Sequence, residues 1–182
     1  MKKKIVVYIA ASLDGYIARE NGEIDWLESV EGEGDNGYED FYQTCDAVVM
    51  GKATYDHVLK LTPEFPYLDK KCYVFSRSAQ GKDQYAEFIN ESVASFLNNL
   101  NQDTKKIWLV GGADILADFL KAERVDEFII SVIPVLLGGG IPLFKQGIPE
   151  MNLKLTHRIP EMNLKLTHMK QYGQIAQLYY EK

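Results

Sequence analysis

The sequence has little of what marks secreted, redox-active or metal-dependent proteins. It holds two cysteines and three histidines among 182 residues. Cys45 and Cys72 lie in no CxxC spacing and have no histidine beside them, and each begins an apolar run. We therefore interpret them as buried, reduced thiols rather than as a redox pair. The three histidines are scattered, so the sequence predicts no metal site.

Long apolar runs and an excess of positive charge are also absent. No apolar run approaches the roughly 20 residues that a membrane-spanning helix needs, and the basic amino terminus leads into no signal-peptide core. The net charge is −6, whereas general binding to nucleic acid or to anionic membranes needs a basic face. These absences predict a cytoplasmic protein with no nucleic-acid or membrane partner, and they leave a small anionic ligand possible.

The remaining composition is that of an ordinary globular protein, with 46% hydrophobic and 25% charged residues. A chain of this length buries about 70% of its unfolded surface as one domain. We therefore expect residues 1–182 to form a single domain.

The most informative stretch lies between residues 107 and 120. Ile107 to Val110 form a short apolar run, Gly111 and Gly112 follow, and the spacing of the next apolar residues is helical. A strand, a glycine turn and a helix start direct backbone N–H groups and the positive end of a helix dipole at one point. This arrangement suits a pyrophosphate, although a tight turn without a ligand gives the same pattern.

Three further apolar runs predict strands whose carboxyl ends carry ligand-binding residue types. Parallel strands bring such ends to one edge of a sheet, where open α/β sheets bind ligands. A single cation at the end of a strand is more often a solvated surface residue. Here, however, glycine, hydroxyl or charged residues follow each of three strands. The predicted strands are 4–11, followed by Ser12-Leu13-Asp14-Gly15; 46–50, followed by Gly51-Lys52-Ala53-Thr54; and 71–75, followed by Ser76-Arg77-Ser78.

Two glycine-rich segments offer further candidate residues. Trp26 precedes the acidic, glycine-rich segment 31–37, which predicts a mobile loop. Trp26 is a candidate substrate-binding residue that would cover a ligand, and the alternative is a core position. Gly139 is the centre of a triple glycine that lets backbone or ligand approach closely, and the alternative is a plain flexible loop.

The carboxyl-terminal third of the chain predicts strands and contains a repeat. Residues 125–137 predict a long strand bent near Pro134, and 174–180 a closing antiparallel strand. The ten residues 148–157 recur unchanged as 159–168. Because the period of eleven is odd, moving from one copy to the other reverses the pleat. We therefore expect one copy to pair in the sheet while the other bulges out or forms an extra hairpin.

Taken together, four motifs resemble those of the dihydrofolate reductase superfamily. The resemblance is closest to its riboflavin-biosynthesis reductase branch, the C-terminal domain of a bifunctional pyrimidine deaminase/reductase. The motifs span nearly the whole chain in order: ASLDGYIA at 11–18, MGKATY at 50–55, VGGA at 110–113 and PVLLGGGIPLF at 134–144.

This resemblance implies a fold and a function. The implied fold is α/β, with a central, mostly parallel sheet of eight to nine strands, an antiparallel C-terminal hairpin and helices on both faces. The implied function is an NADPH-dependent reductase of a small heterocyclic substrate, most like 5-amino-6-(5-phosphoribosylamino)uracil reductase of riboflavin biosynthesis, acting as a homodimer. The deaminase motif with its zinc ligands is absent, so only the reductase step is expected.

The resemblance also assigns residues by their place in the motifs. Asp14 would be catalytic, near the nicotinamide ribose or the substrate. The family usually has Arg at the position of Lys52, which keeps the charge but lacks the bidentate fork. The NADP-binding residues would be Ala11, Gly51, Lys52, Thr54, Ser76, Arg77, Ser78, Val110, Gly111, Gly112 and Ala113.

Two alternatives remain open. Dihydrofolate reductase activity needs a carboxylate on the first helix within a Trp-containing motif, and Asp25, Glu39 and Asp40 do not align with it. A non-catalytic, homodimeric NADP-binding protein is equally consistent with the phosphate-facing residues, because these concern binding alone.

Overall fold

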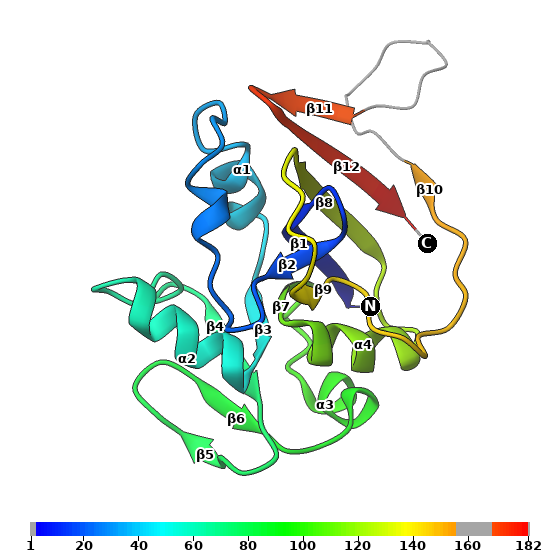
Figure 1. Cartoon of the computed structure of the whole chain (residues 1–182). Helices are drawn as coiled ribbons and strands as arrows, with labels where there is room; N and C mark the ends of the chain where they lie inside the picture. Colours follow the sequence, from blue (N-terminus) through cyan, green and yellow to red (C-terminus); the bar gives the residue numbers. More distant parts are fainter. Residues whose placement is uncertain (1–2, 156–168, 182) are drawn as a thin grey trace.

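The structure, a computed structural model, describes residues 3–155 and 169–181. Within them a ten-stranded sheet has the order β10-β12-β8-β1-β7-β3-β4-β6-β5, and β11 pairs with β12 (Figure 1). A separate two-stranded sheet is formed by β2 and β9. The predicted α/β fold is therefore confirmed, and the sheet has one strand more than the eight to nine expected.

The elements have the following bounds. The strands are β1 (Lys4–Ser12), β2 (Tyr16–Ala18), β3 (Ala47–Gly51), β4 (Lys71–Phe75), β5 (Gly81–Lys82), β6 (Glu87–Ile89), β7 (Lys106–Gly111), β8 (Glu127–Ile133), β9 (Ile141–Pro142), β10 (Lys154–Leu155), β11 (Met169–Tyr172) and β12 (Ile175–Glu181). The helices are the 3-10 turn η1 (Asp25–Leu27), α1 (Tyr38–Gln43), α2 (Lys52–Leu61), α3 (Val93–Asn99) and α4 (Ala113–Lys121).

Six strands of the sheet run in one direction. β1 pairs in parallel with β7 and β8, β3 with β7 and β4, and β4 with β6. Parallel strands of this kind are covered on both faces and read as continuous apolar runs, which is how β1, β3 and β7 appear in the sequence. β12 pairs antiparallel with β8, and β11 with β12, which confirms the antiparallel C-terminal hairpin.

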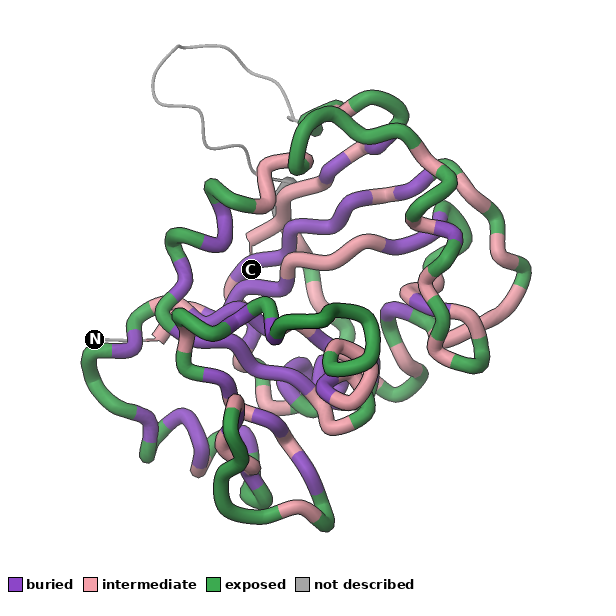
Figure 2. The backbone as a smooth tube through the Cα atoms, turned by 90° about the vertical axis from the view of Figure 1, so that its left-hand side faces the viewer, coloured by how far each residue is buried: buried purple, intermediate pink, exposed green. Residues whose placement is uncertain are grey.

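Helices cover both faces of the sheet, as predicted. The helices α3 and α4 pack on one face, where Phe96 and Phe119 contact the β1 and β7 residues Val7 and Leu109. The helices α1 and α2 lie on the other face with Phe41 and Tyr55. In Figure 2 the central strands are accordingly buried and the connecting loops exposed.

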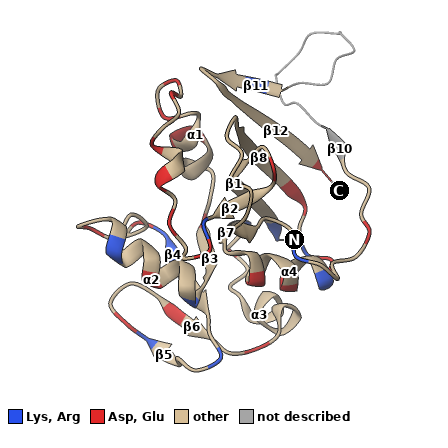
Figure 3. Cartoon of the chain, in the orientation of Figure 1, with Lys and Arg blue, Asp and Glu red and all other residues tan. Residues whose placement is uncertain are grey.

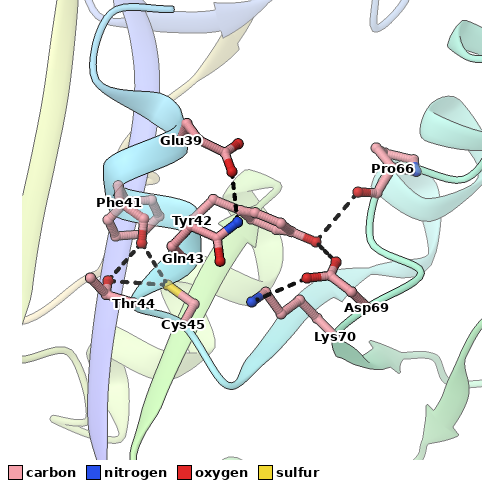
Figure 4. Close-up of polar contacts among 9 residues, drawn as sticks. All are labelled: Glu39, Phe41, Tyr42, Gln43, Thr44, Cys45, Pro66, Asp69 and Lys70. Carbon is pink, nitrogen blue, oxygen red and sulfur yellow. Dashed lines mark hydrogen bonds and ion pairs between the residues drawn. The ribbon is translucent and has the colours of Figure 1, made fainter.

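The short helix α1 is attached to the loop before β4 by polar contacts (Figure 4). The Tyr42 hydroxyl donates to the Asp69 carboxylate, and Lys70 pairs with Asp69 at 3.3 Å. The Lys70 ammonium also lies 4.7 Å from the centroid of the Tyr42 ring. Because α1 has six residues and isolated helices this short are unstable in water, these contacts and its aromatic packing hold it in place.

One expectation for the C-terminal third needs correction, and another concerns residues outside the described ranges. The strand expected over 125–137 ends at Ile133, because Pro134 lacks the N–H that a longer ladder would need. Of the repeated segment, the first copy contributes β10, which pairs with β12. The second copy, 159–168, lies outside the described residues, so the predicted fate of the two copies stays a prediction.

No helix in the described part of the chain is both long and apolar enough to span a membrane.

The side chain of Phe119 tests the contribution of α4 to the core. It is fully buried against the sheet, so Phe119→Ala removes a large apolar side chain and leaves a cavity. We expect the free energy of unfolding in urea to fall by about 3–5 kcal/mol. The neighbouring exposed Asp118 provides the control, and Asp118→Ala should change it by less than about 0.5 kcal/mol. Equal effects of the two substitutions would contradict this packing.

Candidate active site

The parallel arrangement brings the predicted strand ends to one edge of the sheet. Gly111 at the end of β7 is opposite Met50 of β3, and Gly51 is opposite Phe75 at the end of β4. Ser12, the last residue of β1, is opposite Ile133 of β8. The segments after β1, β3, β4 and β7 therefore meet at the carboxyl edge, as the sequence predicts.

Two helices begin side by side at this edge. α2 begins after Gly51 and α4 after Gly112, and neither start has a side-chain cap. A Cβ on Gly51 would lie 4.0 Å from the Gly112 nitrogen, so the two starts are adjacent. By contrast, the α3 start is capped by Ser92, whose side chain accepts from the Ser95 nitrogen. Two uncapped helix starts at one place concentrate partial positive charge there.

The two glycines of β7 and α4 are needed for different reasons. Gly111 has a φ of +124°, a backbone conformation that L side chains rarely adopt. A Cβ on Gly112 would lie 3.2 Å from the Thr54 Oγ1 of α2, closer than a comfortable contact. The missing side chain thus lets the starts of α2 and α4 approach each other closely, with the Thr54 hydroxyl beside the Gly112 backbone. Free backbone N–H groups next to a hydroxyl are the groups that bind a phosphate at a helix start.

The predicted cation Lys52 is the first residue of α2 and forms an ion pair within the helix. Its Nζ lies 2.6 and 2.7 Å from the two carboxylate oxygens of Asp56. Both side chains are more than a third exposed, and such surface pairs are worth only about 0–1 kcal/mol. Lys52 can therefore exchange Asp56 for an anionic ligand at small cost.

The segment after β4 combines one buried hydroxyl with exposed groups. Ser76 is buried, and its Oγ accepts from the Ser78 and Ala79 backbone nitrogens at 3.3 and 2.9 Å. Its hydroxyl thus shapes the turn, while the side chains of Arg77 and Ser78 are exposed. Of these three predicted residues, Arg77 and Ser78 face solvent and Ser76 supports them.

The other predicted cofactor residues contribute backbone rather than side chains. Ala11 and Ala113 are buried at 3% and 4% exposure, and Val110 packs against the aromatic core on the α1 and α2 face. At these positions a ligand would meet main-chain atoms of the strand ends or of the α4 start.

Asp14 lies in the turn after β1, where its carboxylate joins two loops. It accepts hydrogen bonds from Ser12 Oγ at 2.6 Å and from the backbone nitrogens of Leu137 and Gly138 at 3.1 and 2.7 Å. The hydrogen bond from Ser12 is the largest cause of a pKa of Asp14 below its ordinary value, and the two backbone donors act in the same direction. Asp14 is therefore an ionised acceptor at neutral pH.

The triple glycine also has a positional reason. A Cβ on Gly140 would lie 2.3 Å from the Ala18 carbonyl oxygen, so the chain passes too close to β2 for a side chain. Gly139 has open space around its Cβ position. The triple glycine thus lets the backbone at Gly140 pass close to the backbone of β2. Gly139 stays a predicted substrate contact.

Trp26 lies in the core rather than at the surface. Its side chain is 3% exposed in η1 and packs with Ile133 and Ile175. The indole Nε1 is also buried, without a hydrogen-bond partner. Trp26 therefore does not cover an open site, as one of the two sequence-based interpretations expected, but occupies the core position that was the alternative.

Sequence reasoning missed two features. Lys145 forms an ion pair with Asp114 in the first turn of α4, and nothing in the sequence linked these residues. Gln177 is fully buried on the sheet, and an inward position in the alternating strand 174–180 was the available signal. Among the described residues, no group of three or more His, Cys, Asp or Glu side chains is placed to hold a metal ion.

The fold and its edge define a class of protein, an α/β domain with the topology of dihydrofolate reductase. The structure of Enterococcus faecalis dihydrofolate reductase, a complex with NADP(H) and RAB-propyl, matches the fold with a TM-score of 0.65 at 15% identity over 98% of this chain and 95% of that one. The chain belongs to the RibD C-terminal domain family, whose model matches residues 3–178.

Individual relatives support this assignment. The uncharacterized protein YwjB of Bacillus subtilis (strain 168) is 52% identical over 99% of this chain and 98% of its own length. A putative riboflavin biosynthesis protein from Shewanella sp. PV-4 has a TM-score of 0.79 at 30% identity, with 98% of each chain covered.

A bifunctional enzyme shares the fold over part of its length. The Thermotoga maritima diaminohydroxyphosphoribosylaminopyrimidine deaminase/5-amino-6-(5-phosphoribosylamino)uracil reductase has a TM-score of 0.68 at 16% identity. The match covers 99% of this chain but 56% of the Thermotoga protein.

The hydrogen bonds of Asp14 predict how its contact with Gly138 depends on pH. Because the pKa of Asp14 is lowered, the contact with Gly138 is present above the ordinary Asp pKa of about 3.9 and is lost as pH falls through the lowered value. In a titration followed by NMR, the Gly138 amide shift should have its midpoint below pH ~3.9. In Asp14→Asn the transition should be absent, whereas in the control Glu20→Gln it should be unchanged. A midpoint at or above pH ~3.9 in the wild type would contradict the arrangement.

Proposed function

We propose that this chain is a cytoplasmic, homodimeric, NADPH-dependent reductase of a small heterocyclic substrate, most like 5-amino-6-(5-phosphoribosylamino)uracil reductase. The observation that carries the proposal is the pair of uncapped helix starts at Gly51 and Gly112, which lie side by side at the carboxyl edge of the sheet. Family membership supports the same reading, since the Thermotoga relative is named for this reductase.

The residues at the edge fit a dinucleotide phosphate by their chemistry. The α2 and α4 starts with Thr54 would hold the pyrophosphate, and Lys52 would add charge. Arg77 and Ser78 would bind the 2′-phosphate, with the Ser76 hydroxyl holding their turn in shape. The cofactor would supply the hydride.

Within this proposal Asp14 acts as an acceptor and not as a proton donor. Its carboxylate is exposed and ionised, and it ties the turn after β1 to residues 137 and 138. We propose that it accepts from a hydroxyl of the substrate or of the nicotinamide ribose while holding the two loops together. Positioning of this kind accounts for a large part of the rate of a transfer reaction.

Two other functions compete with this one. Dihydrofolate reduction is disfavoured because Glu39 and Asp40, the acids of α1, are exposed. The carboxylate of Asp25 is paired with Arg19 at 2.6 Å. A non-catalytic NADP-binding protein differs from the proposed enzyme only in the absence of turnover.

Cofactor binding is the first test. Quenching of the fluorescence of Trp26 and Trp108 should show tighter binding of NADPH than of NADH. Substitution of both cations, Lys52→Ala with Arg77→Ala, should weaken NADPH binding by about 1–3 kcal/mol, the range for charged hydrogen bonds. Lys60→Ala, at the opposite end of α2, is the matched control and should have no effect. If the wild type binds neither nucleotide, the proposal fails.

Turnover separates the enzyme from the binding protein. With 5-amino-6-(5-phosphoribosylamino)uracil as substrate, wild type should oxidise NADPH, and Asp14→Asn should lower kcat by at least tenfold, because the amide nitrogen would face the Gly138 donor. The affinity for NADPH should stay within about threefold. Bound NADPH without turnover of this or related heterocycles would favour the non-catalytic alternative, and unchanged turnover in the variant would remove Asp14 from the site. Light scattering checks the dimer.

A further inference from the structure

A fully buried amide side chain lies on the sheet face that α1 only partly covers. The Gln177 Nε2 of β12 donates to the Ser131 Oγ at 2.9 Å and to the Tyr8 hydroxyl at 3.1 Å. Its Oε1 accepts from the Tyr179 hydroxyl. The three strands β12, β8 and β1 are neighbours in the sheet, next to β10 at one end of the strand order, so this network joins three adjacent strands.

The network is covered by a segment that is weakly attached. We call residues 28–37 the acidic strap, because its exposed residues include Glu31, Glu33 and Asp35. In Figure 3 the ribbon is red at the acidic residues of this loop and of α1. It contacts the network through one group, the Asn36 carbonyl oxygen. That oxygen accepts from the Tyr8 hydroxyl at 3.2 Å and from Gln177 Nε2 at 3.5 Å.

Both contacts are longer than good hydrogen bonds of their kinds, which lie near 2.8 and 2.9 Å. The strap is also attached through the Gln174 nitrogen, which donates to the Glu31 carbonyl at 3.2 Å, and through the partly buried Val30. In addition, Gly37 packs closely on the Tyr172 hydroxyl, and the backbone of Glu31 and Gly32 packs on Gly173. Three glycines lie in it, at 32, 34 and 37. Few apolar contacts and long hydrogen bonds mark a segment that opens at low free-energy cost.

Under the same strap lies a donor without an acceptor. Trp26 Nε1 is buried and unpartnered, and its ring packs on Ile133 and Ile175. Ile133 lies two residues after Ser131 in β8, and Ile175 lies two residues before Gln177 in β12, on the same face of the sheet. Two residues of a strand span about 6.6 Å, so the Trp26 ring lies about that far from the network, toward the carboxyl edge. Buried donors that lack a good acceptor require an explanation.

We propose that Tyr8 and Gln177 recognise a ring carbonyl of the substrate, and that the Asn36 carbonyl occupies its place in the free chain. The occupant is a planar heterocycle with carbonyl acceptors, of the aminouracil class, bound between the sheet and the displaced strap. Tyr8, whose ring stacks on Phe41 at 4.4 Å, gives such a ring an aromatic neighbour. This inference rests on the proposed function and deepens it.

The position fits the proposed chemistry. Two residues beyond Ser131 toward the carboxyl edge lies Ile133, on which Trp26 packs. Ser12, the end of β1, is directly opposite Ile133. A substrate whose ring lies on Tyr8 and Gln177 thus extends its sugar toward the edge where Asp14 lies and where we place the nicotinamide.

The test measures binding of 5-amino-6-(5-phosphoribosylamino)uracil and of NADPH separately, by calorimetry. Tyr8→Phe and Gln177→Leu should each raise the Kd of the aminouracil about tenfold and leave the Kd of NADPH within twofold. Tyr42→Phe is the matched control: it removes a hydroxyl of the same aromatic cluster that binds Asp69 instead, and it should change neither Kd. Circular dichroism checks that each variant is folded.

Hydrogen exchange of the strap gives an independent readout. Addition of the aminouracil to wild type should increase amide exchange in residues 31–37, because the Asn36 carbonyl is displaced. Unchanged or slower amide exchange in residues 31–37 overturns the inference. An aminouracil Kd that stays within twofold of the wild-type value in both Tyr8→Phe and Gln177→Leu also overturns it. So does a wild-type protein that binds NADPH but does not bind the aminouracil. A wild type that fails to bind NADPH but binds the aminouracil through Tyr8 and Gln177 overturns the proposed function and upholds this subsite.

Discussion

Parallel pairing of six strands is the constraint on which the rest of the molecule depends. It requires that β1, β3, β7 and β8 be largely apolar, because helices or loops cover each side. It also requires that every crossover return the chain to the same end of the sheet, so that the strand ends gather at one edge. Core and candidate site are therefore consequences of the same pairing, and neither can change without the other.

Much of this could be predicted from the sequence, because the signals are local. Uninterrupted apolar runs identified β1, β3, β4 and β7, and a glycine pair followed by helical spacing identified α4. The ends of β8 were less certain, because a run rich in Ile and Val continues past Pro134 although the ladder does not. Residue types at strand ends located the edge, and the resemblance supplied the mostly parallel sheet with its antiparallel C-terminal hairpin.

What the sequence did not show depends on partners far away along the chain. Asp14 is tied to residues 123 and 124 positions away, and Gln177 meets Tyr8 across 169 positions. No periodicity or short motif reports such pairs. Trp26 illustrates the same point, because its place beneath the strap follows from the arrangement of β8 and β12 rather than from its neighbours in sequence.

The outer side of β12 is shared between two short strands. β10 pairs with Tyr180 and Glu181, and β11 pairs with residues 175–178, so each strand takes its register from a different part of β12. The length of chain that connects Leu155 to Met169 is then set by neither ladder, and the free energy of closing a connection depends only weakly on its length. Residues inserted between β10 and β11 would therefore leave the pairing of each strand with β12 unchanged.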